Sequence, residues 1–349
     1  MPTLNDLGEF EAIRRLAAAG GFARGASGVI VGTGDDAAVL RPAQGCDVVA
    51  TTDAFVEGRH FDVHRMGPAE IGARLAAACL SDVAAMAARP RWAIHALGVR
   101  GGHDAAALVE LQGGLSRALE ADGAAIVGGN LTAVEGAEWL SLTVLGEVAR
   151  DHAWTRAGAR PGDAIAVTGW PGRAGAGWLL ARRPAAAGAG ASPWQPLLDA
   201  YYRPRSRVAL ALALAETRAV RAAIDVSDGL TADLFHLCEA SGTSAELDAD
   251  ALGGDTLLAR AAAALGLAPE RLALGPSDDY ELLLALDPAG RTACETLAAA
   301  AGVPLRVIGR ITPGPPKLTR LDPKGERRPL PPSGFDHFGP AGHGDEAGA

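Results

Sequence analysis

The chain contains 349 residues, 48% of them hydrophobic and 21% charged, which excludes general disorder and suffices for two domains that each bury a core. The 32 basic and 41 acidic side chains leave a formal charge of −9, which argues against nucleic acid or an anionic membrane as the main partner. The four cysteines show no CxxC spacing, and no signal-peptide core or bilayer-length apolar run occurs, so we expect a cytoplasmic protein without a zinc or disulfide framework.

Lysine is almost absent from the chain. It occurs only at Lys317 and Lys324, close to the C-terminus. A P-loop requires the pattern GxxxxGK[ST], and a protein-kinase fold requires an upstream lysine against the ATP phosphates, so neither can be placed here. Any phosphate chemistry in this protein must therefore use metal ions, arginines and backbone amides.

The first half of the chain alternates helical and strand patterns. Residues 6–19 predict a helix, with Asp6 and Glu9 as a cap pair and Gly20-Gly21 as its end. Further helices are expected at 68–88 and 104–121, and strands at 28–31, 47–50, 92–99, 124–127 and 139–148.

A domain boundary is expected at residues 150–162, which are rich in Gly, Pro and Arg. It separates an N-terminal domain, residues 1–150, from a C-terminal domain, residues 151–338. Residues 339–349 offer nothing that could pack and are expected to form a disordered tail.

The second half resumes with a strand at 164–169, a Gly-rich loop up to Gly177 and a surface loop at 184–196. Helices are expected at 205–217, 229–240, 254–265 and 288–300, and strands at 222–226, 244–247, 280–286 and 304–311. The whole pattern indicates the α/β class (α+β), with two domains built on mixed sheets.

Aspartates at strand ends and beside glycines form the most informative pattern. They occur in Gly34-Asp35-Asp36, Thr51-Thr52-Asp53, Ser81-Asp82 and the segment 225–229. Carboxylates at the ends of neighbouring strands converge, and their repulsion favours a bound cation such as Mg²⁺, which prefers oxygen ligands. Each motif alone is more typical of a helix cap or a turn, but four together favour a metal site.

Asp82 is the aspartate that a turn explains least. It follows Ile71 by eleven residues, which returns it to within about 20° of the apolar stripe of the helix at 68–88. A carboxylate on such a stripe needs a metal ion or a basic partner, for which Arg74 and Arg89 are available. The pattern modestly favours the metal.

Two further patterns have alternative interpretations. Residues 32–37 imitate a dinucleotide-binding fingerprint, but Arg41-Pro42 leaves no room for the helix that must follow. Asn130-Leu131-Thr132 matches a glycosylation sequon, yet Gly128-Gly129-Asn130 fits better as a loop that meets a phosphate or a metal.

In chain order the motifs are GDDAAV, TTDAFVEGRHF, CLSDVAAMAARP, GGN, RAGARPGD, DVSDGLTADL, DDYELL and GFDHF. Together they resemble the thiamine-monophosphate kinase family over roughly residues 5–338. This family belongs to an ATP-binding superfamily that includes aminoimidazole ribonucleotide synthetase and selenophosphate synthetase.

The resemblance implies a two-domain fold like that of aminoimidazole ribonucleotide synthetase. It also implies a homodimer whose N-terminal domains pair through their sheets, with ATP at their interface, and a mixed α/β C-terminal domain. The implied reaction is direct phosphoryl transfer from ATP to thiamine phosphate, which gives ADP and thiamine diphosphate and requires several Mg²⁺ ions.

The resemblance further implies roles for individual residues. Catalytic roles fall on Asp82, Asp225 and Asp228. The implied metal ligands are Asp36, Thr51, Thr52, Asp53, Asp82, Asn130, Asp225 and Asp228. The implied ATP contacts are Gly129, Asn130, Arg156 and Ser227, and the implied thiamine-phosphate contacts are His60, Asp278 and Phe335. Three of these positions depart from the usual family residues. Asn130 stands where the family often has Asp, although Asn also occurs there, Asp278 stands for Glu, and Phe335 stands for Trp.

Alternatives remain for the function and for His60. Another superfamily member, of the selenophosphate synthetase or hydrogenase-maturation type, would share the ATP site, but the former needs a reactive cysteine near the N-terminus and the first here is Cys46. A catalytically inactive ATP-binding protein is a second alternative, against which the complete aspartate set argues. His60 could act as a nucleophile, although a substrate contact or a structural role is expected, and His95 and His236 are expected to be packing residues.

Overall fold

The computed structural model of the chain describes residues 2–19, 26–33, 36–183, 193–322 and 324–338. Most of the expected surface loop at 184–196 and the whole expected tail at 339–349 lie outside the described residues. The chain divides into two compact units, Met1–Ala153 and Trp154–Ala349. Among the described residues, no helix combines the length and the apolar character that crossing a membrane requires.

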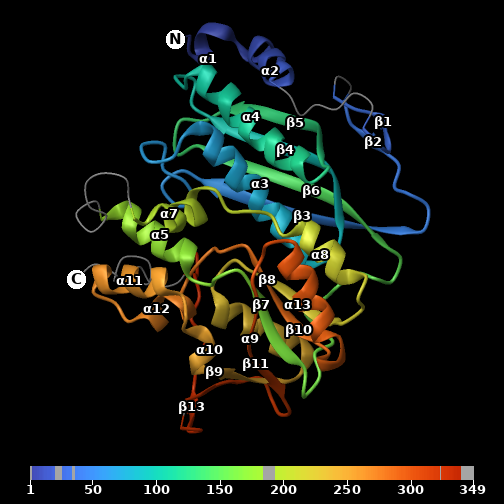
Figure 1. Ribbon diagram of the computed structural model, residues 1–349. Coiled ribbons are helices and arrows are strands. Elements are labelled where there is room, and N and C mark those ends of the chain that lie inside the picture. The colour runs from blue at the N-terminus through green and yellow to red at the C-terminus, as the bar shows by residue number, and fades with distance from the viewer. Residues whose placement is uncertain (1, 20–25, 34–35, 184–192, 323, 339–349) are drawn as a thin grey trace. The chain divides into compact units, whose positions relative to one another are not determined.

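The first unit contains a four-stranded sheet, a small two-stranded sheet and the helices that accompany them (Figure 1). Its elements in chain order are α1 (Leu4–Leu7), α2 (Glu9–Ala18), β1 (Val29–Val31), β2 (Val39–Leu40), β3 (Cys46–Val56), α3 (Pro68–Ala85), β4 (Arg89–Val99), α4 (Ala105–Ala121), β5 (Ala125–Ala133) and β6 (Trp139–Ala149).

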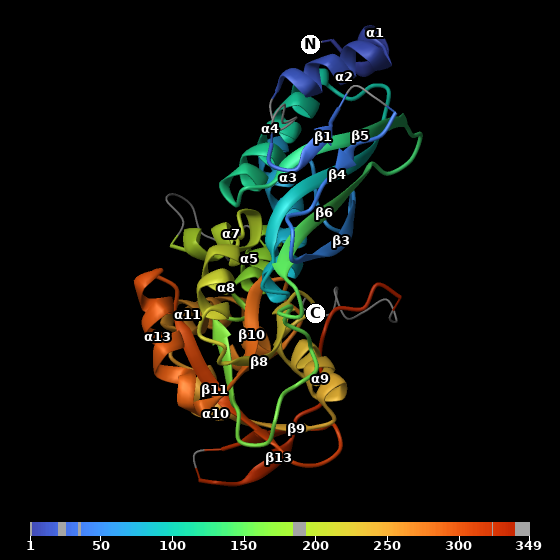
Figure 2. The same ribbon diagram turned by 90° about the vertical axis from the view of Figure 1, so that its right-hand side faces the viewer.

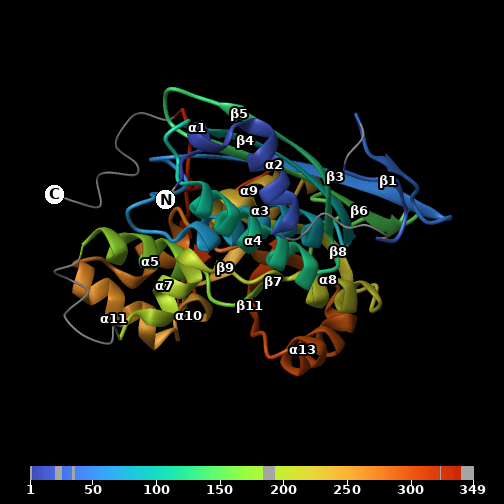
Figure 3. The same cartoon turned by 90° about the horizontal axis from the view of Figure 1, so that it is seen from above.

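The four-stranded sheet has the strand order β3-β6-β4-β5, with β4 and β5 parallel and the other pairs antiparallel. Asp53 of β3 lies opposite Leu142 of β6. Leu142 lies opposite His95 of β4, which lies opposite Gly129 of β5. Directly opposed residues share one face of a sheet, so this row faces one side. Helices α3 and α4 pack together on that side (Figure 2), and α2 lies alongside α4 (Figure 3).

The opposite face of this sheet carries apolar side chains in contact with solvent. Val48 and Thr52 alternate along β3 with the positions that face α3, and Ile94 of β4 occupies the same row as Thr52. Val48 is 48% exposed and Ile94 is 38% exposed. Large apolar residues on one face of a sheet are typical of a surface that another protein covers.

Helix α3 has clear sequence signals at both ends. Pro68 occupies its first turn, and the Glu70 carboxylate accepts a hydrogen bond of 3.0 Å from the amide of Gly67. The helix ends at Ala85, three residues before the expected end, because Ala87 adopts a left-handed φ of 53°.

The second unit is built around a mixed seven-stranded sheet with the order β13-β12-β9-β11-β7-β10-β8. Its elements are β7 (Ala164–Thr168), α5 (Arg173–Arg182), α7 (Gln195–Tyr202), α8 (Val208–Ala215), β8 (Val220–Val226), α9 (Leu230–Ser241), β9 (Ser244–Asp248), α10 (Ala249–Leu252), α11 (Thr256–Leu265), α12 (Pro269–Leu274), β10 (Glu281–Leu286), the 3₁₀ helix η1 (Pro288–Gly290), α13 (Arg291–Ala300), β11 (Leu305–Thr312), β12 (Leu318–Leu321) and β13 (Arg327–Pro329).

Helices cover both faces of this second sheet. Figure 2 shows α9 on one side and α13 on the other. On the α9 side, Leu230, Leu234 and Leu237 pack with strand residues such as Val167 and Ile224. A second apolar cluster joins α5, α7, α11 and α12, which lie together in Figure 1. This arrangement confirms the predicted mixed α/β class.

Several expected elements were wrong in detail. The single helix expected at 6–19 is divided into α1 and α2 by Gly8, whose φ is 72°, and its cap pair is Thr3 with Asp6 instead of Asp6 with Glu9. The segment 128–130, expected as a loop, belongs to β5. The segment 51–53, expected at a strand end, lies in the middle of β3.

The Gly-rich loop expected up to Gly177 is also wrong, because α5 begins at Arg173. A Cβ atom on Gly177 would lie 2.1 Å from the carbonyl oxygen of Leu197, so glycine allows α5 to approach α7 closely. The end of the expected loop at 184–196 belongs to α7. Sequence patterns did not predict the short elements β2, α10, α12, β12 and β13.

Candidate active site

An acidic pair lies between the middle of β3 and the C-terminal half of α3. The Thr51 hydroxyl donates a hydrogen bond of 2.5 Å to the Asp82 carboxylate. Asp53, two residues further on the same face of β3, is close to Asp82 and to the Cys79 thiol. Asp82 therefore faces the sheet, as its helical spacing from Ile71 predicts.

The two carboxylates of this pair oppose each other's ionisation. Burial, and then the charge of Asp82, raise the pKa of Asp53 to about 6. Burial also holds the pKa of the Cys79 thiol well above its usual value, so the thiol stays protonated. At neutral pH the two partly buried negative charges repel each other, and a cation between them would remove that repulsion.

The donors at the acidic pair suit Mg²⁺, because Asp53, Asp82 and Thr51 offer only oxygen atoms. In the described ranges, no group of three or more His, Cys, Asp or Glu side chains has the arrangement of a metal site. A magnesium ion here would therefore complete its coordination with water or phosphate oxygens, as this ion usually does.

The other predicted metal ligands of the first unit lie apart from the acidic pair or on another face. The Thr52 hydroxyl lies on the opposite face of β3, where it donates to the Leu142 carbonyl at 3.2 Å and accepts from Thr143 at 3.0 Å. Asp36 lies exposed between β1 and β2. The structure thus brings the Thr51 and Asp53 side chains to Asp82, and not that of Thr52.

Gly129 and Asn130 lie on β5, at the opposite edge of the sheet from β3. Strands β6 and β4 lie between β3 and β5, which makes three spacings of about 4.8 Å each. Asn130 on β5 therefore lies roughly 14 Å from the strand that carries Asp53. A Cβ atom on Gly129 would lie 2.7 Å from Cε1 of His95, so the imidazole occupies the space that a side chain would need. His95 is 4% exposed, and burial lowers its pKa to about 4, as expected of a neutral packing residue.

His60 follows β3 in the first unit. Its Nδ1 atom accepts a hydrogen bond of 3.0 Å from the amide of Val56, and its ring stacks on Phe55 at a centroid distance of 5.3 Å. In the neutral ring, Nδ1 is therefore the acceptor and Nε2 carries the proton. A protonated Nε2 is a hydrogen-bond donor and not a nucleophile.

In the second unit, the predicted residues gather at the turn between β8 and α9. Asp225 is the next-to-last residue of β8 and is 3% exposed. The Asp233 carboxylate accepts hydrogen bonds from the amides of Ser227, Asp228 and Gly229 at 3.0 to 3.3 Å. One buried side chain in the first turn of α9 thus fixes the path of the turn that carries Ser227 and Asp228.

Titratable and charged groups of both signs lie near Asp228, among them Arg156 and Asp336. Burial raises the pKa of Asp228, while the charges of His236, His337 and Arg156 act in the opposite direction. Arg156 thus lies within electrostatic reach of Asp228, as a shared phosphate site requires. His236, expected to be a packing residue, instead has a side chain that is 49% exposed and is paired with Glu239 at 3.2 Å.

Asp278 and Phe335 lie beside the same turn. The amides of Ser277 and Phe335 both donate to the Asp228 carbonyl, at 3.4 and 3.0 Å. Phe335 is 42% exposed, and its ring meets that of His337 edge-on at 4.8 Å. The structure therefore places Arg156 and Phe335 near the turn that carries Asp225, Ser227 and Asp228, and Asp278 directly follows Ser277, which is bound to that turn.

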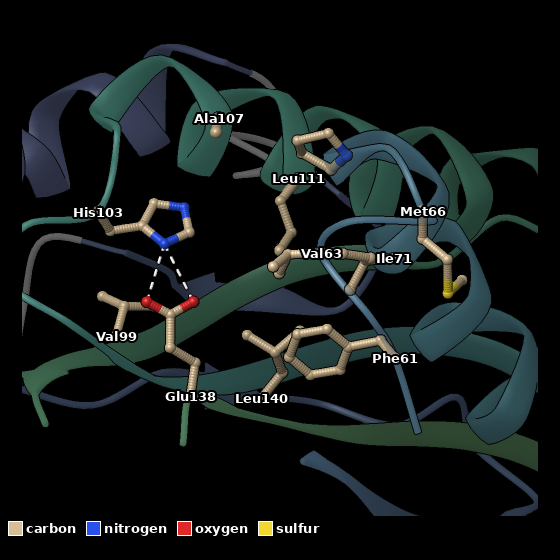
Figure 4. Close-up of a pocket in the computed structure, with 11 residues that line it drawn as sticks. Phe61, Val63, Met66, Ile71, Val99, His103, Ala107, Leu111, Glu138 and Leu140 are labelled. Atoms are coloured by element: carbon tan, nitrogen blue, oxygen red, sulfur yellow. Dashed lines mark hydrogen bonds and ion pairs between the residues drawn. The ribbon is translucent and has the colours of Figure 1, made fainter. Parts of the chain in front are cut away.

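A separate cavity of about 140 Å³ lies in the first unit. Figure 4 shows its polar end, where His103 Nδ1 and a Glu138 oxygen are 2.9 Å apart, and its apolar end at Phe61 and Met66. None of the predicted site residues lines this cavity, although His60 directly precedes Phe61. The cavity is therefore distinct from the acidic pair.

Sequence reasoning missed Cys79 and Asp233, which contact predicted site residues, and Asp279, which directly follows Asp278. Asp233 follows Gly229 by four residues at the start of a helix, a spacing that allows a side chain to reach back to a turn. Asp279 is the second acid of a doublet, and only the first was assigned a role. Cys79 lies on the same helical stripe as Asp82, where it looks like an ordinary core residue.

Known protein families match both units. Residues 34–148 match the family described as AIR synthase related protein, N-terminal domain, and residues 160–319 match its C-terminal domain. A thiamine-monophosphate kinase of Mycobacterium tuberculosis (strain ATCC 25618 / H37Rv) is 34% identical over 319 residues, which cover 91% of this chain and 89% of the relative. One from Escherichia coli (strain K12) is 34% identical over 314 residues, which cover 89% and 92% of the two chains.

Solved structures are similar along nearly the whole chain. Thiamine-monophosphate kinase from Stenotrophomonas maltophilia K279a superposes with a TM-score of 0.78 at 33% identity and covers 92% of this chain and 98% of its own. The structure described as AaThiL complexed with AMPPCP and TMP has a TM-score of 0.73 at 25% identity, with coverages of 97% and 99%. The hydrogenase maturation protein HypE of E. coli, at 20% identity and a TM-score of 0.76, shares the fold. These matches show that the chain belongs to the AIR synthase related family and, within it, to the thiamine-monophosphate kinases.

Proposed function

We propose that the protein is an ATP-dependent kinase that transfers a phosphoryl group to thiamine monophosphate and forms thiamine diphosphate and ADP. The acidic pair Asp53–Asp82 carries this proposal, because two partly buried carboxylates beside a hydroxyl provide the oxygen donors that Mg²⁺ needs. Its relatives over about nine-tenths of the chain bear the name of this kinase, and one similar structure holds AMPPCP, an ATP analogue, together with TMP.

The acceptor in this reaction is itself a phosphate. An anionic acceptor needs no general base, so the protein must mainly position the two substrates and reduce their repulsion. Mg²⁺ bound to the aspartates would neutralise phosphate charge. In the first unit, Asp53 and Asp82 would hold Mg²⁺ together with Thr51. In the second unit, Asp225 and Asp228 would be the Mg²⁺ ligands.

Hydrogen-bond donors replace the missing lysine. Arg156 can pair with phosphate oxygens through its guanidinium group, and Ser227 can donate its hydroxyl. His60 Nε2–H is suited to donate to the phosphate of thiamine monophosphate, since Val56 engages Nδ1. Phe335 supplies an exposed aromatic face for the cationic thiazolium ring.

The active protein is proposed to be a homodimer that pairs through the face of the first unit's sheet on which Val48 and Ile94 are exposed. Their burial in a dimer would remove apolar surface from water. Asn130 and Asp53 lie on strands at opposite edges of one sheet. In a dimer, Asp53 of one copy and Asn130 of the other could contact the same ATP molecule. As ATP is the proposed donor, we assign the protein to the cytoplasm.

A substrate panel tests the proposed activity. Purified full-length protein should release ADP from ATP with Mg²⁺ and thiamine monophosphate, and should release much less with thiamine or with Mg²⁺ replaced by EDTA. Equal ADP release with and without thiamine monophosphate would contradict the assignment. No release with any acceptor would favour an inactive ATP-binding protein.

A further inference from the structure

The carboxylate of Asp279 joins the start of α5 to the segment that precedes β10. It accepts hydrogen bonds from the amides of Gly172 at 2.6 Å and Ala174 at 2.9 Å. Beside it, the Ser277 hydroxyl oxygen accepts the amide of Gly175 at 2.9 Å. These three amides of the first turn of α5 are thus engaged within the unit and do not bind a substrate phosphate.

The residue after Asp279 has a strained backbone. Tyr280 adopts a φ of 52°, in the left-handed region that bulky residues rarely occupy. Its amide donates to the Val226 carbonyl at 2.8 Å, and the next residue, Glu281, forms an ion pair with Arg207 at 2.5 Å. Such strain persists where the surroundings determine the backbone, and it is typical of functional sites.

Asp278 lies between these anchors. Ser277 on one side is held by the Asp228 carbonyl and by Gly175, and Asp279 on the other side is held by α5. An aspartate has a short side chain, so the place of its carboxylate follows closely the place of its Cα atom. The position of Asp278 therefore depends on the hydrogen bonds of its two neighbours.

A simple cap of α5 is the alternative role for Asp279. A cap explains the two hydrogen bonds, and its loss would reduce the stability of the unit. It does not explain why the same carboxylate stands next to a strained residue and next to a proposed substrate contact. Neutralising the carboxylate distinguishes the two roles. If Asp279 only caps α5, the change lowers stability and leaves substrate binding as it is, whereas a role in placing Asp278 predicts weaker substrate binding.

We propose that Asp279 is a positioning residue: by holding the first turn of α5 against residues 277–280, it fixes Asp278 for contact with thiamine monophosphate. This inference rests on the proposed function, which assigns Asp278 to that substrate. Asp279 itself touches only the protein, so its effect on the reaction passes through Asp278.

The test is steady-state kinetics of the full-length Asp279→Asn variant, which keeps the shape of the side chain. Loss of a charge-assisted hydrogen bond should raise the KM for thiamine monophosphate about tenfold or more, while the KM for ATP changes less than about threefold. Asp163→Asn is the matched control, because Asp163 is 2% exposed and accepts the Arg160 amide at 2.7 Å just before β7. The control should lose stability without a change in either KM.

A double-mutant cycle separates the two roles further. In the Asp278→Asn background, Asp279→Asn should add less than about twofold to the KM for thiamine monophosphate, since both changes act on one contact. Fully multiplicative effects, an unchanged KM, or equal shifts of both KM values would overturn the inference. If Asp279→Asn does not fold, Ser277→Ala, which removes the neighbouring Gly175 contact, must show the same selective rise. Failure of the wild-type protein to phosphorylate thiamine monophosphate would instead contradict the proposed function.

Discussion

At the scale of single residues, the site is built from carboxylates placed where they oppose stability. The raised pKa values of Asp53, Asp233 and Asp279, about 6, 6 and 7, all have burial as their largest cause. Each of these groups destabilises the folded state once it ionises. Asp53 stands beside a second carboxylate. Asp233 holds the turn that carries Ser227 and Asp228, and Asp279 holds the first turn of α5 beside Asp278.

Neutralising single carboxylates of the two proposed metal-binding positions should separate activity from stability. Asp82→Asn and Asp225→Asn should each abolish turnover and leave the fold intact, because each removes a charge that Mg²⁺ must balance. Mg²⁺ should raise the Tm of the wild-type protein and not that of Asp82→Asn, as measured by calorimetry at pH 8. Asp47→Asn is the control and should keep full activity, because Asp47 lies at the far end of β3, the strand that carries Asp53. Activity close to wild type at saturating Mg²⁺ in either site variant would refute the metal assignment.

The pKa of Asp279 predicts a pH-dependent difference in stability. Burial raises this pKa from 3.8 to about 7, and the nearby Glu281, itself paired with Arg207, also acts to raise it. The folded state therefore binds the proton more tightly than the unfolded state does, and stability is lost as the pH rises through this window. The free energy of unfolding of the wild type should fall relative to Asp279→Asn between pH 4 and 8, by at most about 4 kcal/mol. The free energies of unfolding are measured by urea denaturation at pH 4 and pH 8. A difference between wild type and variant that is the same at both pH values would show that the prediction is wrong.

At the scale of elements, the C-terminal segment is attached to the start of α9. The Thr231 hydroxyl donates to the Ser333 carbonyl at 3.1 Å and accepts the Ser333 amide at 2.9 Å. Phe335 follows, with its amide on the Asp228 carbonyl and its ring exposed. The backbone is thus fixed beside the predicted site while the aromatic face stays accessible.

This arrangement predicts a substrate-selective role for Phe335. A desolvated contact between a cation and an aromatic ring stabilises binding by roughly 0.5–2 kcal/mol, so Phe335→Ala should raise the KM for thiamine monophosphate about 3- to 30-fold. The KM for ATP should change little, and Phe335→Trp should be tolerated. Phe338→Ala is the matched control, because Phe338 is 98% exposed in the same segment. An alanine variant that shifts both KM values equally would exclude a stacking role.

The sequence predicted long elements better than local geometry. The apolar stripe that placed Asp82 toward the sheet, and the order of helices and strands, follow from hydrophobic periodicity, which depends on near neighbours. The helix α5 was missed because Gly175 and Gly177 suggest a loop, whereas Gly177 allows close packing against α7 and Gly175 allows close packing against Pro276 and Ser277. The roles of Asp233 and Asp279 were missed because each depends on a turn whose backbone path follows from tertiary packing.

At the scale of the whole molecule, the exposed apolar residues Val48 and Ile94 on one sheet face of the first unit predict self-association. Val48→Glu should place a charge on that face and favour the monomer, because burial of an unpaired carboxylate is unfavourable. Sedimentation velocity should show a dimer for the wild type and a smaller species for the variant, with lower specific activity. Ile13→Glu, a matched change at a 36% exposed residue on α2, should leave the dimer intact. A fully active wild-type monomer under assay conditions would contradict the dimer.

The central claim is that this chain transfers the γ-phosphoryl group of ATP to a phosphate acceptor. The most direct measurement is a single turnover with γ-³²P-labelled ATP, Mg²⁺, thiamine monophosphate and excess protein, with separation of the products. We expect the label to appear in thiamine diphosphate at the rate at which ADP forms. Label found in inorganic phosphate alone, or ATP left intact while thiamine monophosphate is bound, would contradict the claim.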